Sequence, residues 1–162
     1  MIKLSFVCGS GLSSKLISWW GQGYNGWSHV DAVLPDGTLL GARDDSPGGT
    51  KPGVQIRPAN YETWARRDVL ELETTPTQAF SWEVYLRAQV GKPYDQAAIL
   101  GFILGKADHD SGHWICSALQ TAALEKVGIL PAGFSDSIAT SQVAPNALHL
   151  LALGLGAKRS IP

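Results

Sequence analysis

A β-hairpin signal between residues 28 and 45 constrains the fold most. The stretch SHVDAVL (28–34) has β-branched residues at period-two spacing, and TLLGARDD (38–45) returns after the turn sequence PDG (35–37). Proline sets φ for such a turn, aspartate caps it, and glycine tolerates positive φ. Two strands joined in this way pair antiparallel, so the sequence predicts an antiparallel sheet.

The remaining segments supply further short strands and several helices. Strand patterns cover 2–9, 54–58 and 69–73, and helical patterns cover 13–23, 60–68, 75–91, 114–128 and 145–156. In the helix at 75–91, Thr75 and Thr77 are both candidate caps, and Ala79, Trp82, Tyr85, Leu86 and Val90 are expected to face inward. This mixture predicts an α+β fold.

Length and composition limit the classes of function. A chain of 162 residues fits one domain, 1–162, and can bury a sizeable core. The net charge of -1 gives no field that would recruit nucleic acid or an anionic membrane. No apolar run reaches the roughly 18 residues of a membrane span. Two cysteines, Cys8 and Cys116, do not form a disulfide framework.

Cys116 begins the helical pattern in the segment HDSGHWICSALQTAALEKVG (109–128). A helix N-terminus presents unpaired N–H groups and a partial positive charge, which favour a thiolate and can hold an oxyanion. Cys116 is therefore a candidate nucleophile. The alternative is a small buried apolar residue, a common state of cysteine.

A cysteine nucleophile needs a base within reach. His29 begins a predicted strand of the hairpin, a rigid position that holds geometry well. It is one of four histidines in the chain. The segment GKPYD (91–95) places Tyr94 at a turn before the cysteine-bearing helix. The alternatives are a core or surface histidine and a core tyrosine.

Three motifs carry a resemblance to a known family. GWSHVDAVLPDG (26–37), GKPYD (91–95) and WICSALQTAAL (114–124) occur in this order. Together they resemble the circularly permuted branch of the NlpC/P60 papain-like superfamily, the YiiX/YebB-like group, in its small bacterial and phage-encoded members. In ordinary NlpC/P60 proteins the cysteine helix precedes the histidine strand, whereas here the histidine comes first.

The resemblance implies a fold and roles for three residues. It implies a papain-like antiparallel sheet or partial barrel packed against helices, with the cysteine at a helix N-terminus. Cys116 matches the nucleophile, His29 matches the general base, and Tyr94 matches the tyrosine beside the thiol in relatives.

The family's third polar residue, which orients the histidine from the adjacent strand, has no direct match. Alignment of LLGAR (39–43) with that strand places Gly41 there, which departs from the family pattern. Hairpin pairing predicts Arg43 or Asp44 opposite His29. Asp44 can accept the imidazole N–H, whereas Arg43 is only a donor. Asp31 lies on the same face as His29 but farther along the strand. Asp44 is thus the candidate orienting residue.

A metal site is the competing interpretation of the cysteine segment. His109, Asp110, His113 and Cys116 are all possible zinc ligands. Their spacing within eight residues matches no common zinc motif, and a helix that begins near 114 would direct them differently. We therefore predict no metal and no cofactor, with His109 and His113 as loop residues near the site.

The resulting expectation is a cysteine peptidase or amidase. By family likeness its substrate is a peptide or amide, such as a cell-wall peptide. Relatives that act on lipids by acyl transfer or thioester cleavage provide one alternative, and a non-catalytic binding module with a degenerate site provides another. The N-terminus lacks a signal-peptide pattern, so the expected location is cytoplasmic or phage-associated. The sequence predicts no oligomeric state.

Overall fold

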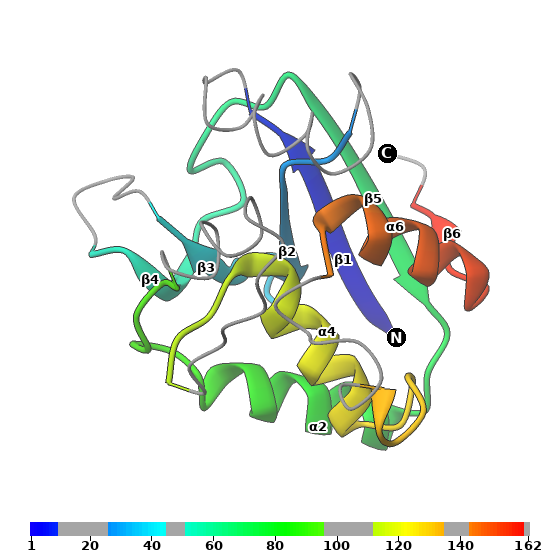
Figure 1. Cartoon of the computed structure of the whole chain (residues 1–162). Helices are drawn as coiled ribbons and strands as arrows, with labels where there is room; N and C mark the ends of the chain where they lie inside the picture. Colours follow the sequence, from blue (N-terminus) through cyan, green and yellow to red (C-terminus); the bar gives the residue numbers. More distant parts are fainter. Residues whose placement is uncertain (10–25, 45–50, 96–111, 135–142, 161–162) are drawn as a thin grey trace.

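The computed structural model describes residues 1–9, 26–44, 51–95, 112–134 and 143–160. Its architecture is α+β, with one open antiparallel sheet of six strands and three helices in the described part (Figure 1). The strands are β1 Ile2–Cys8, β2 His29–Val33, β3 Leu39–Arg43, β4 Gly53–Arg57, β5 Arg66–Leu72 and β6 Lys158–Arg159. The helices are α2 Pro76–Arg87, α4 Cys116–Lys126 and α6 Pro145–Gly154.

The strand order is β4-β3-β2-β1-β5-β6, so β1 and β2 lie in the middle of the sheet. β1 pairs along its whole length with β5, from Ile2 opposite Leu72 to Cys8 opposite Arg66. The other side of β1 pairs with β2, where Val7 lies opposite His29. The N-terminal residue of β2 is therefore held against β1.

The predicted hairpin is present. Gly37 in the turn has φ +82°, and the backbone N–H and hydroxyl of Thr38 both donate to the side chain of Asp36. The register pairs Val33 with Leu39 and Ala32 with Leu40. This turn fixes which residues of β3 lie beside the polar residues of β2.

Alternate residues of the central strands have different surroundings, as the pleat requires. Leu4, Phe6, Val30 and Ala32 are fully buried in the core, which also includes side chains from all three helices. The intervening residues of β2 are His29 and Asp31, which are polar and also buried. A buried polar pair on a central strand must be compensated by partners, and this pair forms the centre of the candidate site.

α4 lies against β2 and β3, with α2 alongside it and α6 near β5 (Figure 1). Gln120 of α4 donates from Nε2 to the carbonyl of Leu40 over 3.1 Å, which ties the helix to β3. Thr75 caps α2: its hydroxyl accepts from Gln78 N–H, and the Gln78 side chain reaches back to the Thr75 N–H. Of the two candidate caps, Thr75 is the one used.

Some sequence expectations were wrong. Residues 60–68 form a turn and the start of β5 rather than a helix, because pairing with β1 over its full length outweighs local helical preference. Val90 is 44% exposed rather than inward-facing, because α2 ends at Arg87, before Val90. The two-residue strand β6 was not predicted. The expected helix at 13–23 lies outside the described residues.

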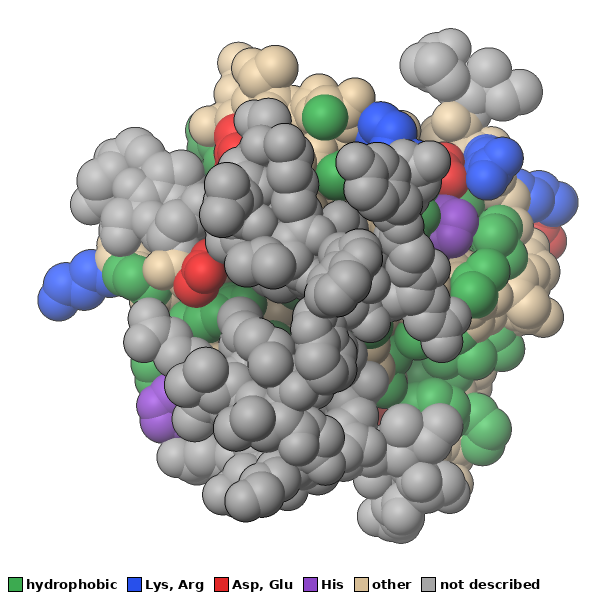
Figure 2. All heavy atoms as spheres, turned by 45° about the horizontal axis from the view of Figure 1, so that its top comes forward, with side chains coloured by type: hydrophobic (Ala, Val, Ile, Leu, Met, Phe, Trp, Pro, Cys, Tyr) green, Lys and Arg blue, Asp and Glu red, His purple; other side chains and the backbone are tan. Residues whose placement is uncertain are grey.

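No helix in the described ranges is long and apolar enough to cross a membrane. In Figure 2 basic and acidic side chains are interspersed on the visible face, in keeping with the small net charge. Hydrophobic side chains gather on the right-hand side, where Figure 1 places α6. The exposed large apolar residues of that region are Leu150, Leu153 and Leu155.

Candidate functional site

Cys116 is the first residue of α4 and is 5% exposed. The residue before it, Ile115, is the N-cap, and its side chain makes no capping hydrogen bond because it is a hydrocarbon. The N–H groups of the first turn therefore have no cap from that side chain. Cys8, the other cysteine, is not joined to Cys116 by a disulfide.

His29 lies beside this thiol. The imidazole is within hydrogen-bonding reach of Cys116, although the two residues are far apart in sequence. The contact arises because α4 packs on β2 and β3 with its N-terminus toward the first residue of β2. Two of the three residues matched to the family pattern are thus brought together.

Asp31 holds the other side of the imidazole. Nε2 of His29 is 2.8 Å from Oδ1 of Asp31, and both side chains are buried. An ionised carboxylate only accepts hydrogen bonds, so Nε2 carries the proton. Nδ1 is then the ring nitrogen that remains for the thiol of Cys116. This arrangement fixes the tautomer that a thiol base requires.

The charges of the three groups are coupled. Burial opposes the charged imidazolium, but the Asp31 carboxylate and the Cys116 thiolate outweigh it and raise the pKa of His29 to about 10. Burial also opposes ionisation of Asp31, yet His29, Arg57 and the Tyr61 hydroxyl lower the pKa of its carboxyl. The site therefore favours an imidazolium on His29 beside the carboxylate of Asp31 at neutral pH.

Gly41 explains why Asp31 can reach this position. A Cβ added at Gly41 would lie 1.9 Å from Oδ1 of Asp31 and 3.3 Å from the carbonyl oxygen of Val30. Asp31 thus occupies the space beside β3 that a side chain at position 41 would take. The glycine at position 41, which departs from the family pattern, therefore leaves the space that the carboxylate of Asp31 on β2 occupies.

Asp44, the residue expected to orient His29, does not do so. It follows β3 and is exposed, and the imidazole N–H is directed to Asp31. Continuation of the β2–β3 register places Arg43, not Asp44, opposite His29. The physical reason is that residues two apart on a strand share a face, so Asp31 is close enough without help from the neighbouring strand.

Tyr94 lies on the segment that runs beside the entry to α4. Its backbone forms a parallel bridge with Trp114, two residues before Cys116. The bridge is held by a 3.1 Å hydrogen bond from Trp114 N–H to Pro93 and by another from Asp95 N–H to Trp114. The structure therefore places the GKPYD segment next to the segment that leads into Cys116, with the Tyr94 side chain half-buried against the core.

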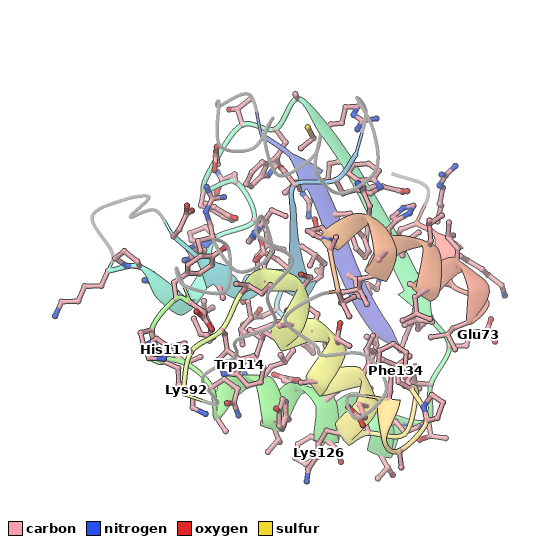
Figure 3. The ribbon with its side chains drawn as sticks, in the orientation of Figure 1. Glu73, Lys92, His113, Trp114, Lys126 and Phe134 are labelled. Carbon is pink, nitrogen blue, oxygen red and sulfur yellow. The ribbon has the colours of Figure 1, made fainter. Side chains whose placement is uncertain are left out.

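The metal interpretation finds no support in the described part. Among the described residues, no group of three or more His, Cys, Asp or Glu side chains is arranged to hold a metal ion. His109 and Asp110 lie outside the described residues. His113 precedes α4 and lies near Lys92 and Trp114 (Figure 3). Cys116 has His29 as its neighbour.

Several residues of the site were not anticipated from the sequence. The loop between β4 and β5 (58–65) contributes Tyr61, whose hydroxyl lies 3.0 Å from Oδ2 of Asp31, and Trp64, whose ring stacks on His29 with centroids 6.4 Å apart. Arg57 is buried and electrostatically favours the Asp31 anion. The one available signal was the aromatic pair in NYETWARRD, which a helical interpretation concealed.

No model of a known protein family matches this chain, and no curated protein sequence matches it significantly.

Proposed function

We propose that this protein is a cysteine hydrolase of the peptidase or amidase type, with Cys116 as nucleophile, His29 as base and Asp31 as the residue that orients His29. The observation that carries the proposal is the buried Cys116–His29–Asp31 series, in which Asp31 accepts the Nε2 proton and His29 contacts the thiol. A nucleophile, a base and an orienting group in this order are the elements of a catalytic triad.

The expected reaction follows from the charges. His29 takes the proton of the Cys116 thiol, and the sulfur attacks the carbonyl carbon of an amide or ester. The tetrahedral intermediate collapses as the imidazolium gives its proton to the leaving amine or alcohol. A thioester on Cys116 remains. Water, deprotonated by His29, then releases the acid and restores the thiol.

The start of α4 is suited to hold the oxyanion. Backbone N–H groups at a helix N-terminus point outward along the axis and carry partial positive charge. Ile115 does not cap them with its side chain, which is the state that an oxyanion site needs. Tyr94, on the adjacent segment, is the second candidate donor for this oxygen.

The substrate class is taken from the family resemblance. The motif order supports a permuted papain-like hydrolase, and the antiparallel sheet with the cysteine at the start of a helix is compatible with that fold. A peptide or amide, such as a cell-wall peptide, is the substrate to test first. The protein would then act on murein-derived material, in a bacterial or phage setting.

A non-catalytic module had its best support in the absence of a polar residue at Gly41. That support is removed by Asp31, which accepts the imidazole N–H from its own strand. An orienting group is present at the site, although it comes from a different position. The catalytic proposal is therefore preferred to the degenerate one.

The first test is the reactivity of Cys116 toward iodoacetamide in a Cys8→Ser background, so that a single thiol reacts. We expect alkylation near neutral pH to be at least about tenfold faster than for an ordinary exposed thiol, and His29→Ala to remove this excess. Alkylation no faster than that of an unperturbed thiol, with no effect of His29→Ala, would contradict the proposal.

The second test addresses turnover. Murein peptides and simple peptide amides are incubated with the protein, and mass spectrometry follows both products and an adduct on Cys116. We expect a thioester adduct that disappears in Cys116→Ala. A reactive Cys116 that forms no adduct with any peptide or amide would retain the dyad but reject this substrate class.

A further inference from the structure

The carboxylate of Asp31 has two oxygens with different partners. Oδ1 accepts from Nε2 of His29 at 2.8 Å, and Oδ2 lies 3.0 Å from the hydroxyl of Tyr61. Tyr61 comes from the β4–β5 loop, which no motif of the sequence had connected with the site. Both oxygens of the carboxylate therefore have a hydrogen-bond partner, and the proposed triad accounts only for the partner of Oδ1.

The direction of the Tyr61 hydrogen bond follows from its other neighbour. Nη1 of Arg43 lies 3.0 Å from the Tyr61 oxygen, and a guanidinium is only a donor. The tyrosine oxygen accepts from Arg43, so its single proton goes to Asp31. Burial and the nearby Asp31 carboxylate raise the pKa of Tyr61, so this hydroxyl keeps its proton at all physiological pH values.

The surroundings hold Tyr61 in place. Its backbone N–H donates to the carbonyl of Pro58 at 3.1 Å, and Arg43 is paired with Glu62 at 2.7 Å. The Arg43 guanidinium lies over the rings of Tyr61 and Trp64, at 5.2 Å and 5.3 Å from their centroids. The loop is thus attached to β3 by a partly buried cation, Arg43, next to the polar pair of β2.

We propose that Tyr61 is a positioning residue: its hydroxyl holds the Asp31 carboxylate in the orientation that accepts the His29 N–H. The inference rests on the proposed function. It adds a group that acts on His29 through Asp31. Without the hydroxyl, Oδ2 loses a donor in a buried setting, and the carboxylate turns from His29 toward its remaining partners.

The test is a double-mutant cycle on the full chain with Cys8→Ser. Tyr61→Phe removes only the hydroxyl, and Asp31→Asn removes the charge on which it acts. We expect Tyr61→Phe to slow alkylation of Cys116 at neutral pH by about tenfold or less, the scale of one charge-assisted hydrogen bond. In the Asp31→Asn background the same change is expected to have almost no effect.

Tyr85→Phe is the matched control, because Tyr85 is a half-buried tyrosine of α2 whose nearby carboxylate is Glu125 rather than Asp31. A second measurement does not depend on activity: the exchange of the His29 Nε2 proton with water, followed by NMR. It should be faster in Tyr61→Phe than in Tyr85→Phe. This measurement still tests the role of Tyr61 if Tyr61→Phe lowers the stability of the protein.

Two results would overturn the inference. One is an equal effect of Tyr61→Phe with and without Asp31, which would mean a general packing role. The other is an effect no larger than that of Tyr85→Phe, with unchanged proton exchange at His29. Either result leaves the proposed function intact if His29→Ala still abolishes the excess reactivity of Cys116. Loss of that His29 dependence would instead reject the proposed function.

Discussion

The carboxylate of Asp31 lies in the space that a side chain on Gly41 would need. A Cβ at position 41 would come 1.9 Å from Oδ1, the oxygen that accepts the His29 N–H. The two positions are therefore mutually exclusive sites for an orienting group. β2 carries the carboxylate, and position 41 of β3 must therefore lack a side chain.

Gly41→Ala should displace Asp31 and disconnect it from His29. We expect alkylation of Cys116 to slow by about tenfold or more, with a loss of stability of roughly 1–3 kcal/mol because the methyl group overpacks a filled site. Gly154→Ala is the control, since a Cβ there meets nothing within 4 Å and φ is not positive. Equal reactivity in both variants would show that the close approach has no consequence.

The orienting group can also be moved across the hairpin. Asp31→Gly is expected to lower the reactivity of Cys116 strongly, and Asp31→Gly with Gly41→Asp should restore part of it, because the space emptied on β2 receives the carboxylate from β3. The measurement is the alkylation rate relative to each single variant. A double variant no better than Asp31→Gly would argue against exchangeable positions.

Asp31→Asn tests the charge without changing the shape. It should reduce the reactivity of Cys116 by about tenfold or more. The neutral amide does not stabilise the imidazolium as the carboxylate does, and it can pair with either tautomer of His29. It should also lower the pKa of His29, which the Asp31 carboxylate raises against the opposing effect of burial. Asp44→Asn is the control, and an equal loss there would restore Asp44 as the orienting residue.

The pH dependence of stability should report the charged pair. The pKa of His29 is raised from 6.5 to about 10, so its contribution is complete below about pH 6.5 and is lost as the pH rises through about 10. The wild type should exceed His29→Gln in free energy of unfolding at about pH 6, and this advantage should shrink by about pH 10. Urea titrations of the wild type and of His29→Gln at the two pH values measure this difference. A difference that does not vary with pH would contradict the raised pKa of His29.

The capping box of α2 gives a prediction independent of function. Thr75→Ala should lower the free energy of unfolding by about 1 kcal/mol, because the Gln78 N–H loses its acceptor. Thr77→Ala should cost less than about 0.5 kcal/mol, since residue 77 lies inside the helix. Similar losses for both, measured by urea denaturation, would contradict the capping assignment.

Much of the fold could be predicted from local patterns. The hairpin, β1, β4 and the three described helices follow from period-two or helical spacing together with turn and cap residues. The segment 60–68 could not be, because its composition favours a helix while its actual role is set by pairing with β1 and by contacts of Tyr61 and Trp64. Such preferences are decided by distant parts of the chain.

The candidate site was predictable to a similar degree. Cys116 and His29 could be selected from motif order, and the structure places them in contact. The acceptor for His29 could not be selected from the sequence. Asp31 reaches His29 along one strand only because Gly41, on the neighbouring strand, has no side chain in that space. A glycine opposite an aspartate, two residues from a histidine, is the pattern that would have indicated it.

The placement of the base and its orienting carboxylate on the same short strand has a consequence for biosynthesis. His29 and Asp31 are synthesised before Cys116 and become neighbours as soon as β2 is extended, whereas Cys116 arrives later, with α4. Docking of that helix is then the step that brings Cys116 to His29. Under the proposed function, Cys116 and His29 form a pair only after α4 has been synthesised and has packed on β2 and β3.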